Sequence, residues 1–264
     1  AIINLSRLLL TINYMIKSKN ILLCETDVLV VGSGIMGVTL ASILKEIEPS
    51  IRVDIVEALN APALESSHAY NNAGTGHAGY CELNYTPLLA NNRIDIKKAV
   101  QINAGFEMSL QYWSFLAKKY RLFSPKKFIN RVPHISLVNG SKNVVYLKKR
   151  YLALKDNLLF KTIEFSTDLK TIGKWIPLLG VKRSPKKYAA TKVECGTDVN
   201  FGEITCQLIS ILKTKRNFHL YTNHKVLDIN EHKDGLWSIK LNGHREIRAK
   251  FIFIASGGHS LKLL

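Results

Sequence analysis

Residues 27–37 have the sequence DVLVVGSGIMG, in which a short apolar run leads into a turn that contains three glycines. The run 28–31 is rich in β-branched residues and predicts a buried strand. Apolar residues then recur at helical spacing at Val38, Ala41 and Leu44. Strand, glycine turn and helix therefore follow one another in the order of a dinucleotide-binding unit.

The three glycines of this turn have different tasks. Gly32 permits the tight turn, Gly34 lets the backbone approach a pyrophosphate without a Cβ in the way, and Gly37 allows the helix to pack closely on the strand. The start of the helix presents unpaired amides and the positive end of its dipole to the phosphates. We therefore predict that a dinucleotide cofactor is bound by Gly32, Ser33, Gly34, Ile35, Met36 and Gly37.

A second strand and an acidic residue complete the unit. Pro49 ends the helix, the apolar run 51–56 predicts a buried strand, and Glu57 follows it. Glu57 comes about 20 residues after Gly37, as a ribose-binding acid does. A carboxylate accepts hydrogen bonds from both ribose hydroxyls and repels a 2′-phosphate, so we predict an unphosphorylated ribose. A generic surface glutamate is the alternative.

The end of the chain favours FAD over NAD as the cofactor. Four strands are expected at 218–222, 225–230, 235–241 and 244–249, with hairpin turns such as Asn242-Gly243 between them. A further apolar strand, 251–255, then runs into Ser256-Gly257-Gly258, and we expect Gly257 to contact the cofactor. This order of strands brings the chain back beside the first βαβ unit, as in flavoproteins of the two-dinucleotide-binding type. The sequence contains no second G-x-G-x-x-G that would indicate a nicotinamide site.

The remaining sequence predicts an α/β protein with an interleaved second domain. Residues 94–120 have helical spacing, and 121–195 combine strand candidates at 135–138 and 144–147 with a helical piece at 151–154. The fold class is a Rossmann-like FAD-binding domain of the two-dinucleotide-binding type with an α+β substrate domain. The expected domains are an N-terminal extension (1–26), a first FAD-binding part (27–92), a substrate domain (93–195) and an incomplete second FAD-binding part (196–264).

Composition excludes several classes of protein. The net charge of +17 is spread over scattered lysine clusters without interleaved aromatic residues, so no nucleic-acid partner is expected. Four widely spaced cysteines indicate neither a metal site nor a disulfide framework, which fits a reducing cytoplasm. No apolar run approaches the ~20 residues of a membrane span. Met15 is a candidate start, which makes 1–14 an upstream extension.

A longer stretch carries a family resemblance. Residues 65–87 have the sequence ESSHAYNNAGTGHAGYCELNYTP, which resembles the malate:quinone oxidoreductase family, as do 128–136 and 196–202. The resemblance implies FAD-dependent oxidation of L-malate to oxaloacetate, with electrons passed to membrane quinone in the tricarboxylic acid cycle. It also implies a cytoplasmic protein bound peripherally to the inner face of the cytoplasmic membrane. Members of the family continue well past the position of residue 264, so we expect a chain truncated at its C-terminus.

Candidate site residues lie in the matching segments. Ser66, Asn72, Thr75 and Gly76 are expected to face the cofactor, although a glycine-rich connector is the alternative. Malate is a dianion, and Arg131, Arg150 and Lys192 are candidates to bind it. A base must take the hydroxyl proton during hydride transfer, and His77 and His134 are the candidates, with a structural histidine as the alternative in each case.

Other functions remain open at the level of sequence. The nucleotide site does not reveal what the flavin oxidises, so another FAD-dependent 2-hydroxy acid or amino acid dehydrogenase is one alternative. An inactive, truncated FAD-binding fragment is another.

Overall fold

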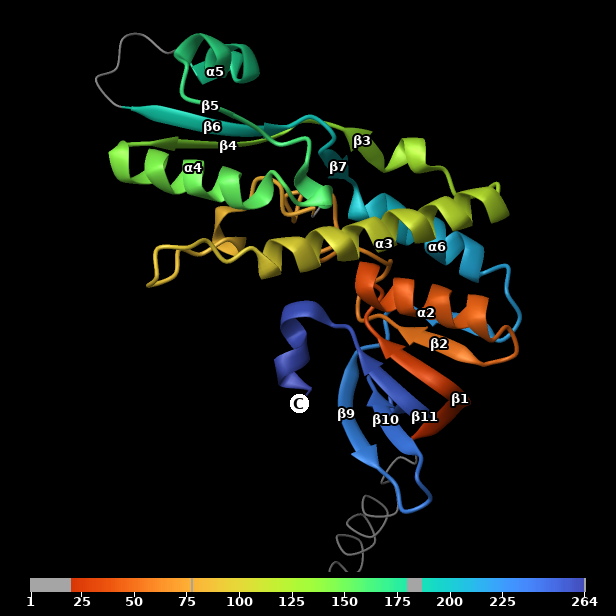
Figure 1. Ribbon diagram of the computed structural model, residues 1–264. Helices are drawn as coiled ribbons and strands as arrows, with labels where there is room; N and C mark the ends of the chain where they lie inside the picture. Colours follow the sequence, from red (N-terminus) through yellow and green to blue (C-terminus); the bar gives the residue numbers. More distant parts are fainter. Residues whose placement is uncertain (1–19, 77, 180–186, 264) are drawn as a thin grey trace, which may run out of the picture. The chain divides into compact units, whose positions relative to one another are not determined.

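The computed structural model of the protein describes residues 20–76, 78–179 and 187–263. The chain divides into two compact units (Figure 1). We call residues up to Asn72, together with those from Phe201 onward, unit 1, and residues Ala73–Asn200 unit 2.

The borders of these units lie at 72/73 and 200/201, whereas the sequence places domain borders at 92/93 and 195/196. The stretch after Asn72 belongs to unit 2 because Thr75 forms an isolated antiparallel bridge with Asp198. Pairing between distant stretches of chain sets these borders, and local composition does not reveal it.

A six-stranded sheet forms the centre of unit 1, in the order β8-β2-β1-β11-β10-β9. The strands β8, β2, β1 and β11 run parallel, and β10 and β9 add an antiparallel meander to β11. The predicted return of the chain beside the first βαβ unit is therefore confirmed. The strands are β1 (Ile21–Val31), β2 (Val53–Val56), β8 (Phe218–Tyr221), β9 (Val226–Glu231), β10 (Trp237–Leu241) and β11 (Arg245–Ile254).

Two strands are longer than the sequence indicates. β1 begins at Ile21, so residues 21–26 belong to the sheet and not to an extension, because they pair with the first half of β11. The expected strands 244–249 and 251–255 are one continuous strand, β11, because β1 accompanies it from Arg245 to Ile254. Partners elsewhere in the chain extend both strands beyond their local apolar signal.

Helices cover one face of this sheet, and the β-meander encloses a core on the other. Helix α2 (Ile35–Ile47) follows β1 and packs against α6 (Phe201–Leu212), which is amphipathic and buries one face. The second core contains Leu29, Val31, Val56, Ile239, Leu241, Ile247 and Ala249, all nearly inaccessible to solvent. Burial on both faces makes β1 the central strand of unit 1.

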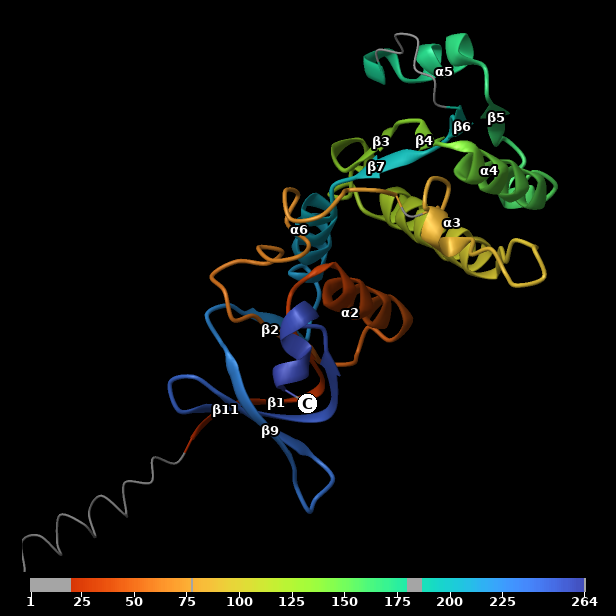
Figure 2. The ribbon, with the colours of Figure 1, turned by 90° about the vertical axis from the view of Figure 1, so that its left-hand side faces the viewer.

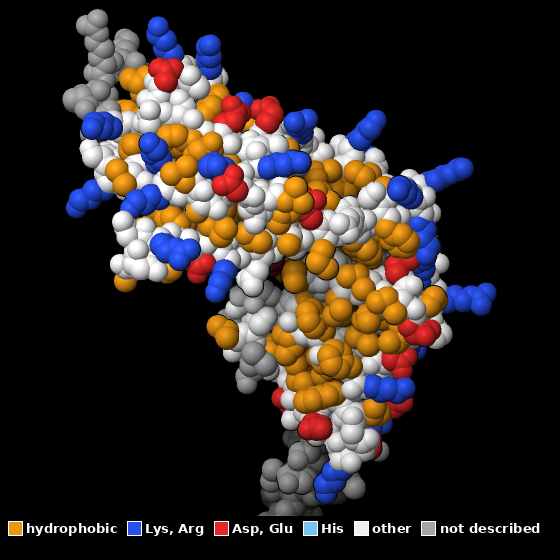
Figure 3. Space-filling model, viewed as in Figure 1, with side chains coloured by type: hydrophobic (Ala, Val, Ile, Leu, Met, Phe, Trp, Pro, Cys, Tyr) orange, Lys and Arg blue, Asp and Glu red, His pale blue; other side chains and the backbone are white. Residues whose placement is uncertain are grey.

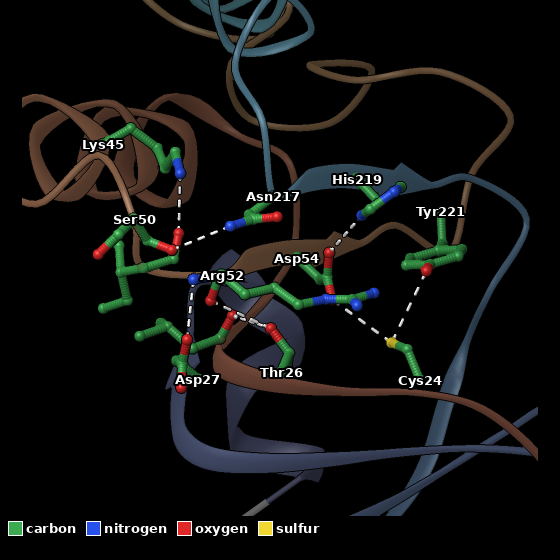
Figure 4. Close-up of polar contacts among 12 residues, drawn as sticks. Cys24, Thr26, Asp27, Lys45, Ser50, Arg52, Asp54, Asn217, His219 and Tyr221 are labelled. Carbon is green, nitrogen blue, oxygen red and sulfur yellow. Dashed lines mark hydrogen bonds and ion pairs between the residues drawn. The ribbon is translucent and has the colours of Figure 1, made fainter.

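A buried carboxylate connects three strands of this sheet (Figure 4). Asp54 has no exposed surface, and its Oδ2 accepts a hydrogen bond from Nε of Arg52 at 2.9 Å while Oδ1 lies 3.0 Å from Nδ1 of His219. The Cys24 thiol donates to Oδ2 at 3.4 Å and lies 3.7 Å from the Tyr221 hydroxyl, which donates to it. The buried charge of Asp54 is thereby compensated by side chains of β1 and β8 and by Arg52, which directly precedes β2.

Unit 2 is built on a three-stranded antiparallel sheet, β4-β6-β5, with α4 and α5 on opposite sides of it (Figure 2). The strands β3 and β7 form a separate two-stranded antiparallel sheet. Helix α3 confirms the predicted long helical segment. The elements are α3 (Lys97–Lys119), β3 (Ile129–Arg131), β4 (His134–Asn139), α4 (Ser141–Leu154), β5 (Glu164–Ser166), α5 (Leu169–Trp175), β6 (Tyr188–Val193) and β7 (Thr197–Val199).

The strand predicted at 144–147 is wrong, because these residues are part of α4. Val144 and Val145 favour a strand locally, which misled the prediction. Leu147, Arg150 and Leu154 lie on one buried face at helical spacing, and burial of that face against β4 and β6 outweighs the local preference.

Across the described residues, none of the helices is both long and apolar enough to span a lipid bilayer.

Candidate functional site

The glycine turn after β1 is shaped by close backbone contacts. Gly32 has a φ of +102°, and a Cβ at this position would lie 2.6 Å from the carbonyl oxygen of Ala255. The Gly32 amide donates to the carbonyl of Val56 at 2.8 Å. The chain therefore leaves β1 in a left-handed conformation between the ends of β2 and β11, which only glycine adopts without strain.

The other two glycines hold the helix close to the strand. A Cβ at Gly37 would lie 2.5 Å from the Gly32 carbonyl oxygen and 2.7 Å from Cγ1 of Val30, so α2 rests directly on β1. Gly34 is the N-cap residue of α2, and a Cβ there would lie 3.1 Å from Oγ of Ser67. Gly32 and Gly37 thus have the turn and packing roles predicted for them, and the approach of Gly34 to a pyrophosphate stays a prediction.

The N-terminus of α2 is suited to an anion. Its N-cap makes no side-chain cap, its first turn carries no acidic residue, and the Met36 side chain at its start is 70 % exposed. Oγ of Ser67 accepts a hydrogen bond from the Ile35 amide at 2.9 Å. The amides of Met36 and Gly37 come next in the first turn, where a helix has no internal acceptors, so they and the helix dipole favour a phosphate.

Glu57 lies directly beside this turn. Its Oε2 accepts hydrogen bonds from the Ser33 amide at 2.9 Å and the Ser33 hydroxyl at 2.7 Å, and Oε1 accepts from the Leu59 amide at 2.9 Å. Ser33 itself is fully buried. The carboxylate is held rigidly at the end of β2, and its remaining lone pairs are available to hydroxyl donors.

Two loops of unit 1 meet near the end of β11. Gly257 has a φ of +54°, and a Cβ there would lie 3.5 Å from Oγ of Ser66. Asn72 folds its own loop, because its Nδ2 donates to the carbonyls of Ser66 at 3.0 Å and His68 at 2.8 Å. Ser66 and Gly257 are thus neighbours, as residues that contact the same cofactor would be. The side-chain amide of Asn72 instead stabilises its own loop by hydrogen bonds.

In unit 2, Thr75 and Gly76 form part of a packed strand-like contact. The Gly76 amide donates to the carbonyl of Thr197 at 2.9 Å, and a Cβ at Gly76 would collide with Oγ1 of the same threonine. A glycine at position 76 therefore allows this backbone to lie close to Thr197 within unit 2. His77 lies outside the described residues.

His134 is enclosed in unit 2. Its side chain is 8 % exposed, its Nε2 lies 3.0 Å from the carbonyl of Thr197, and its ring packs edge-on against Tyr80 with 6.0 Å between ring centres. A Cβ at Gly196 would collide with the ring. The surroundings favour a structural role for His134, with Nε2 as the donor.

Arg131 and Lys192 both lie close to Glu194. Nζ of Lys192 is 2.6 Å from Oε2 of Glu194, and Nε of Arg131 donates to the Glu194 carbonyl at 3.4 Å. The hydrogen bond from Lys192 and the charges of both cations lower the pKa of Glu194. The structure therefore brings two of the three predicted malate-binding cations together at one exposed carboxylate.

Arg150, the third of these cations, is fully buried. Its Nη2 donates to the carbonyls of Tyr80 at 2.8 Å and Gly79 at 3.3 Å, and its Nε donates to Oγ1 of Thr86 at 3.0 Å. Nη1 is buried without a hydrogen-bond partner among the described residues, and burial lowers the pKa of the guanidinium. Arg150 positions the loop that carries Gly79 to Thr86.

Sequence reasoning missed Ser67. Its hydroxyl accepts a hydrogen bond from the first amide of α2 although it lies 32 positions further along the chain. A serine in a Ser-rich loop carries no local signal of that contact.

Comparison with known proteins identifies the family. The family described as malate:quinone oxidoreductase (Mqo) matches residues 24–264 of the chain. The chain belongs to the malate:quinone oxidoreductase family. The resemblance seen in the sequence is thereby confirmed.

Relatives within the malate:quinone oxidoreductase family are about twice as long as this chain. It is 46 % identical to probable malate:quinone oxidoreductase 1 of Pseudomonas aeruginosa over 97 % of this chain and 51 % of that protein. It is 48 % identical to a probable malate:quinone oxidoreductase of Pectobacterium atrosepticum over 90 % of this chain and 47 % of that protein. The chain spans about half the length of these relatives.

Solved structures confirm the predicted α/β fold of this member of the malate:quinone oxidoreductase family. Glycine oxidase from Geobacillus kaustophilus matches with a TM-score of 0.66 and 18 % identity over 90 % of this chain and 57 % of that one. An L-α-glycerophosphate oxidase from Mycoplasma pneumoniae with FAD bound matches with a TM-score of 0.56 and 21 % identity, over 86 % and 53 %. Likeness at this level of identity concerns the fold alone.

Proposed function

We propose that this chain forms the FAD-binding part of an enzyme that oxidises L-malate to oxaloacetate and passes the electrons to membrane quinone. Family membership supports the reaction, and one arrangement carries the cofactor assignment: the exposed N-terminus of α2 lies beside a carboxylate, that of Glu57, which the turn itself holds in place. Binding to the inner face of the cytoplasmic membrane is part of the same proposal and rests on the family resemblance.

The residues of unit 1 fit FAD. Gly34 carries no side chain that would keep its backbone from a diphosphate, and the first amides of α2 would bind that group. Glu57 would accept hydrogen bonds from the ribose hydroxyls, while Ser66 and Gly257 would line the same side. When bound, FAD accepts a hydride equivalent from C2 of malate and delivers electrons to quinone.

The residues of unit 2 would serve the substrate. Arg131 and Lys192 carry two positive charges against the single carboxylate of Glu194, and the surplus charge would attract a carboxylate of malate. Arg150 would act through the loop that it positions, since it has no exposed surface. We assign His77 as the base that takes the C2 hydroxyl proton, because His134 is enclosed and already bound to Thr197.

The test has two steps. First, the purified chain is titrated with FAD, and the quenching of flavin fluorescence is expected to show saturable binding at one site. Next, the chain is completed by co-expression with the remaining half of the Pseudomonas aeruginosa relative and mixed without oxygen with L-malate, 2-hydroxyglutarate or D-alanine. Flavin bleaching by L-malate supports the proposal. The proposal is contradicted if the chain does not bind FAD, or if only 2-hydroxyglutarate or D-alanine bleaches the flavin.

A further inference from the structure

An open hollow lies on unit 2, apart from the residues proposed for the cofactor and the substrate. Its volume is about 430 Å³, within the range of about 300–1,000 Å³ that is typical of small-molecule sites. The surface of the hollow is mostly apolar. We call it the α4 hollow, and its lining residues are Leu88, Asn92, Ser141, Lys142, Val145, Tyr146 and Lys149.

Helix α4 supplies one wall of the α4 hollow. Four of the lining residues recur at i, i+3, i+4 and i+7, which is the spacing of a single helix face. They are Lys142, Val145, Tyr146 and Lys149. The Tyr146 hydroxyl donates to the carbonyl of Thr86 at 2.8 Å, so this face of α4 is also fastened to the chain that leads into the opposite wall.

A short hairpin supplies the opposite wall. Leu88 and Ile94 form an antiparallel bridge, and the Asn92 amide closes the turn on the carbonyl of Leu89 at 2.9 Å. Oδ1 of Asn92 accepts a hydrogen bond from Nζ of Lys149 at 2.5 Å, which joins the hairpin to α4. The walls of the α4 hollow are therefore preformed, as the walls of ligand sites usually are.

Unit 2 carries most of the positive charge of the protein. It contains 22 Lys and Arg against 8 Asp and Glu, which gives +14 of the total net charge of +17. Figure 3 shows these basic side chains over the upper part of the molecule, with apolar side chains between them. The surface of unit 2 is therefore suited to anions that also carry an apolar part.

Near the α4 hollow the positive charge is not compensated by carboxylates. Residues 83–94 and 140–155 contain neither Asp nor Glu. Within the described part of the chain, no carboxylate forms an ion pair with Lys142 or Lys149. The partner of Lys149 is the neutral side chain of Asn92, and an ammonium group has three donors. Both lysines therefore keep charge and donors for an anionic group.

These features select a ligand with two parts. The apolar lining offers few hydrogen-bonding groups, so it would not compensate a small dicarboxylate or a sugar for its lost hydration. Leu88 and Val145 are 48 % and 54 % exposed, and a hydrocarbon chain in the hollow would remove them from water. The two ammonium groups would bind an anionic head group. Because the hollow is concave, a flat bilayer would span its rim, whereas a single acyl chain would fill it.

We propose that the α4 hollow binds a single-chain anionic amphiphile, of which a fatty acid is the simplest example. The head group would lie between the ammonium groups of Lys142 and Lys149, and the acyl chain would pack against Leu88, Val145 and Tyr146. This site shares no residue with the proposed FAD and malate sites, so the inference does not depend on the oxidation reaction.

The direct test is a calorimetric titration of the protein with decanoate, kept below the concentration at which it forms micelles. We expect saturable binding of one molecule, and we expect affinity to fall at least about tenfold for butanoate, which lacks most of the acyl chain, and for decanol, which lacks the charge. Equal affinities for decanoate and decanol contradict the proposal. Binding to phosphatidylglycerol vesicles without binding of free decanoate also contradicts it, because the partner would then be a bilayer.

A matched pair of variants tests the position of the acyl chain. Val145→Trp would fill the α4 hollow, whereas Leu152→Trp places the same side chain outside the lining, at a residue of α4 that is 49 % exposed. We expect Val145→Trp to weaken decanoate binding at least about tenfold and Leu152→Trp to leave it unchanged, with both variants retaining the thermal melt of the parent. Equal effects of the two substitutions would place the ligand elsewhere and overturn the proposal.

Two adjacent lysines of α4 test the position of the head group. Lys149 lines the hollow, whereas Lys148 is exposed and does not line it. We expect Lys149→Gln to lower the affinity for decanoate at least about fivefold and Lys148→Gln to leave it unchanged. If Lys149→Gln binds decanoate as tightly as the parent protein does, the proposed head-group site is wrong.

Discussion

At the scale of single residues, the glycine turn depends on contacts that leave no room for a methyl group. Gly37 is the clearest case, because the two nearest neighbours of a Cβ there would be the backbone oxygen of Gly32 and a methyl group of Val30 in β1. Neither can move without shifting α2 from β1, and the position of α2 sets where its amides meet a phosphate.

Gly37→Ala is therefore expected to lower the free energy of unfolding by about 1–3 kcal/mol and to weaken FAD binding. Denaturant melts and flavin titration measure the two effects. Gly105→Ala is the control, because Gly105 is an exposed position inside α3 with nothing within 4 Å of its Cβ, and alanine there should stabilise by about 0.5–1 kcal/mol. An equal loss of stability in both variants would argue against the contact.

Glu57 serves both the turn and the proposed ribose site. Glu57→Gln turns one acceptor oxygen into a donor that faces a Ser33 or Leu59 donor, and it removes the charge that strengthens the hydrogen bonds. We expect FAD affinity to fall about tenfold to a hundredfold, since a hydrogen bond to a charged group contributes about 1.5–3 kcal/mol. Glu65→Gln, at an exposed position of the following loop, should leave the titration unchanged.

At the scale of elements, α4 is joined to the loop from Gly79 to Thr86 by one buried guanidinium. Arg150 donates hydrogen bonds to carbonyls and a hydroxyl but to no carboxylate, so dipoles are its direct partners. A guanidinium can be buried when its planar group donates hydrogen bonds to several acceptors at once. The ammonium group of a lysine does not reproduce this geometry.

Arg150→Met leaves buried carbonyl oxygens without donors, so the free energy of unfolding is expected to fall by about 2–5 kcal/mol. Denaturant midpoints provide the measurement, and limited proteolysis should then cut between Gly79 and Thr86. The exposed Arg131→Met should change stability by no more than about 0.5 kcal/mol. If Arg150→Met melts like the parent chain, the guanidinium does not position the loop.

At the scale of the whole molecule, buried phenols and thiols predict how stability depends on pH. Burial raises the pKa of Tyr80 from 10.0 to about 12, and burial also raises the pKa of Cys24 and of Tyr221. Each group ionises more easily in the unfolded chain than in the folded one. Their stabilising contribution is therefore complete below about pH 9 and is lost as the pH rises toward the folded values.

Urea melts between pH 8 and pH 11.5 should show this alkaline loss, and Tyr80 should account for up to about 3 kcal/mol of it. Tyr80→Phe is expected to flatten the curve above pH 10, whereas Tyr70→Phe should not, because Tyr70 is 91 % exposed. Curves of identical slope in the parent chain and in Tyr80→Phe would contradict the assignment.

The nucleotide turn and the family could be predicted from the sequence because their determinants are local. A glycine with positive φ, the start of a helix and an acid after the next strand act through their near neighbours, so DVLVVGSGIMG and Glu57 indicate a dinucleotide site without any knowledge of the rest of the fold. The order of strand and helix likewise indicates the parallel part of the sheet.

Contacts between distant stretches decided the rest. Tertiary burial made a helix of the β-branched run in α4, and pairing with β1 joined two expected strands into β11. Close packing against Gly196 and Tyr80 encloses His134, which favours a structural role over that of a base. Arg150 is fully buried, which favours the role of a structural anchor over that of a direct ligand. Free energies of burial and of long-range hydrogen bonds exceed local preferences, and the sequence alone does not state which distant residues will meet.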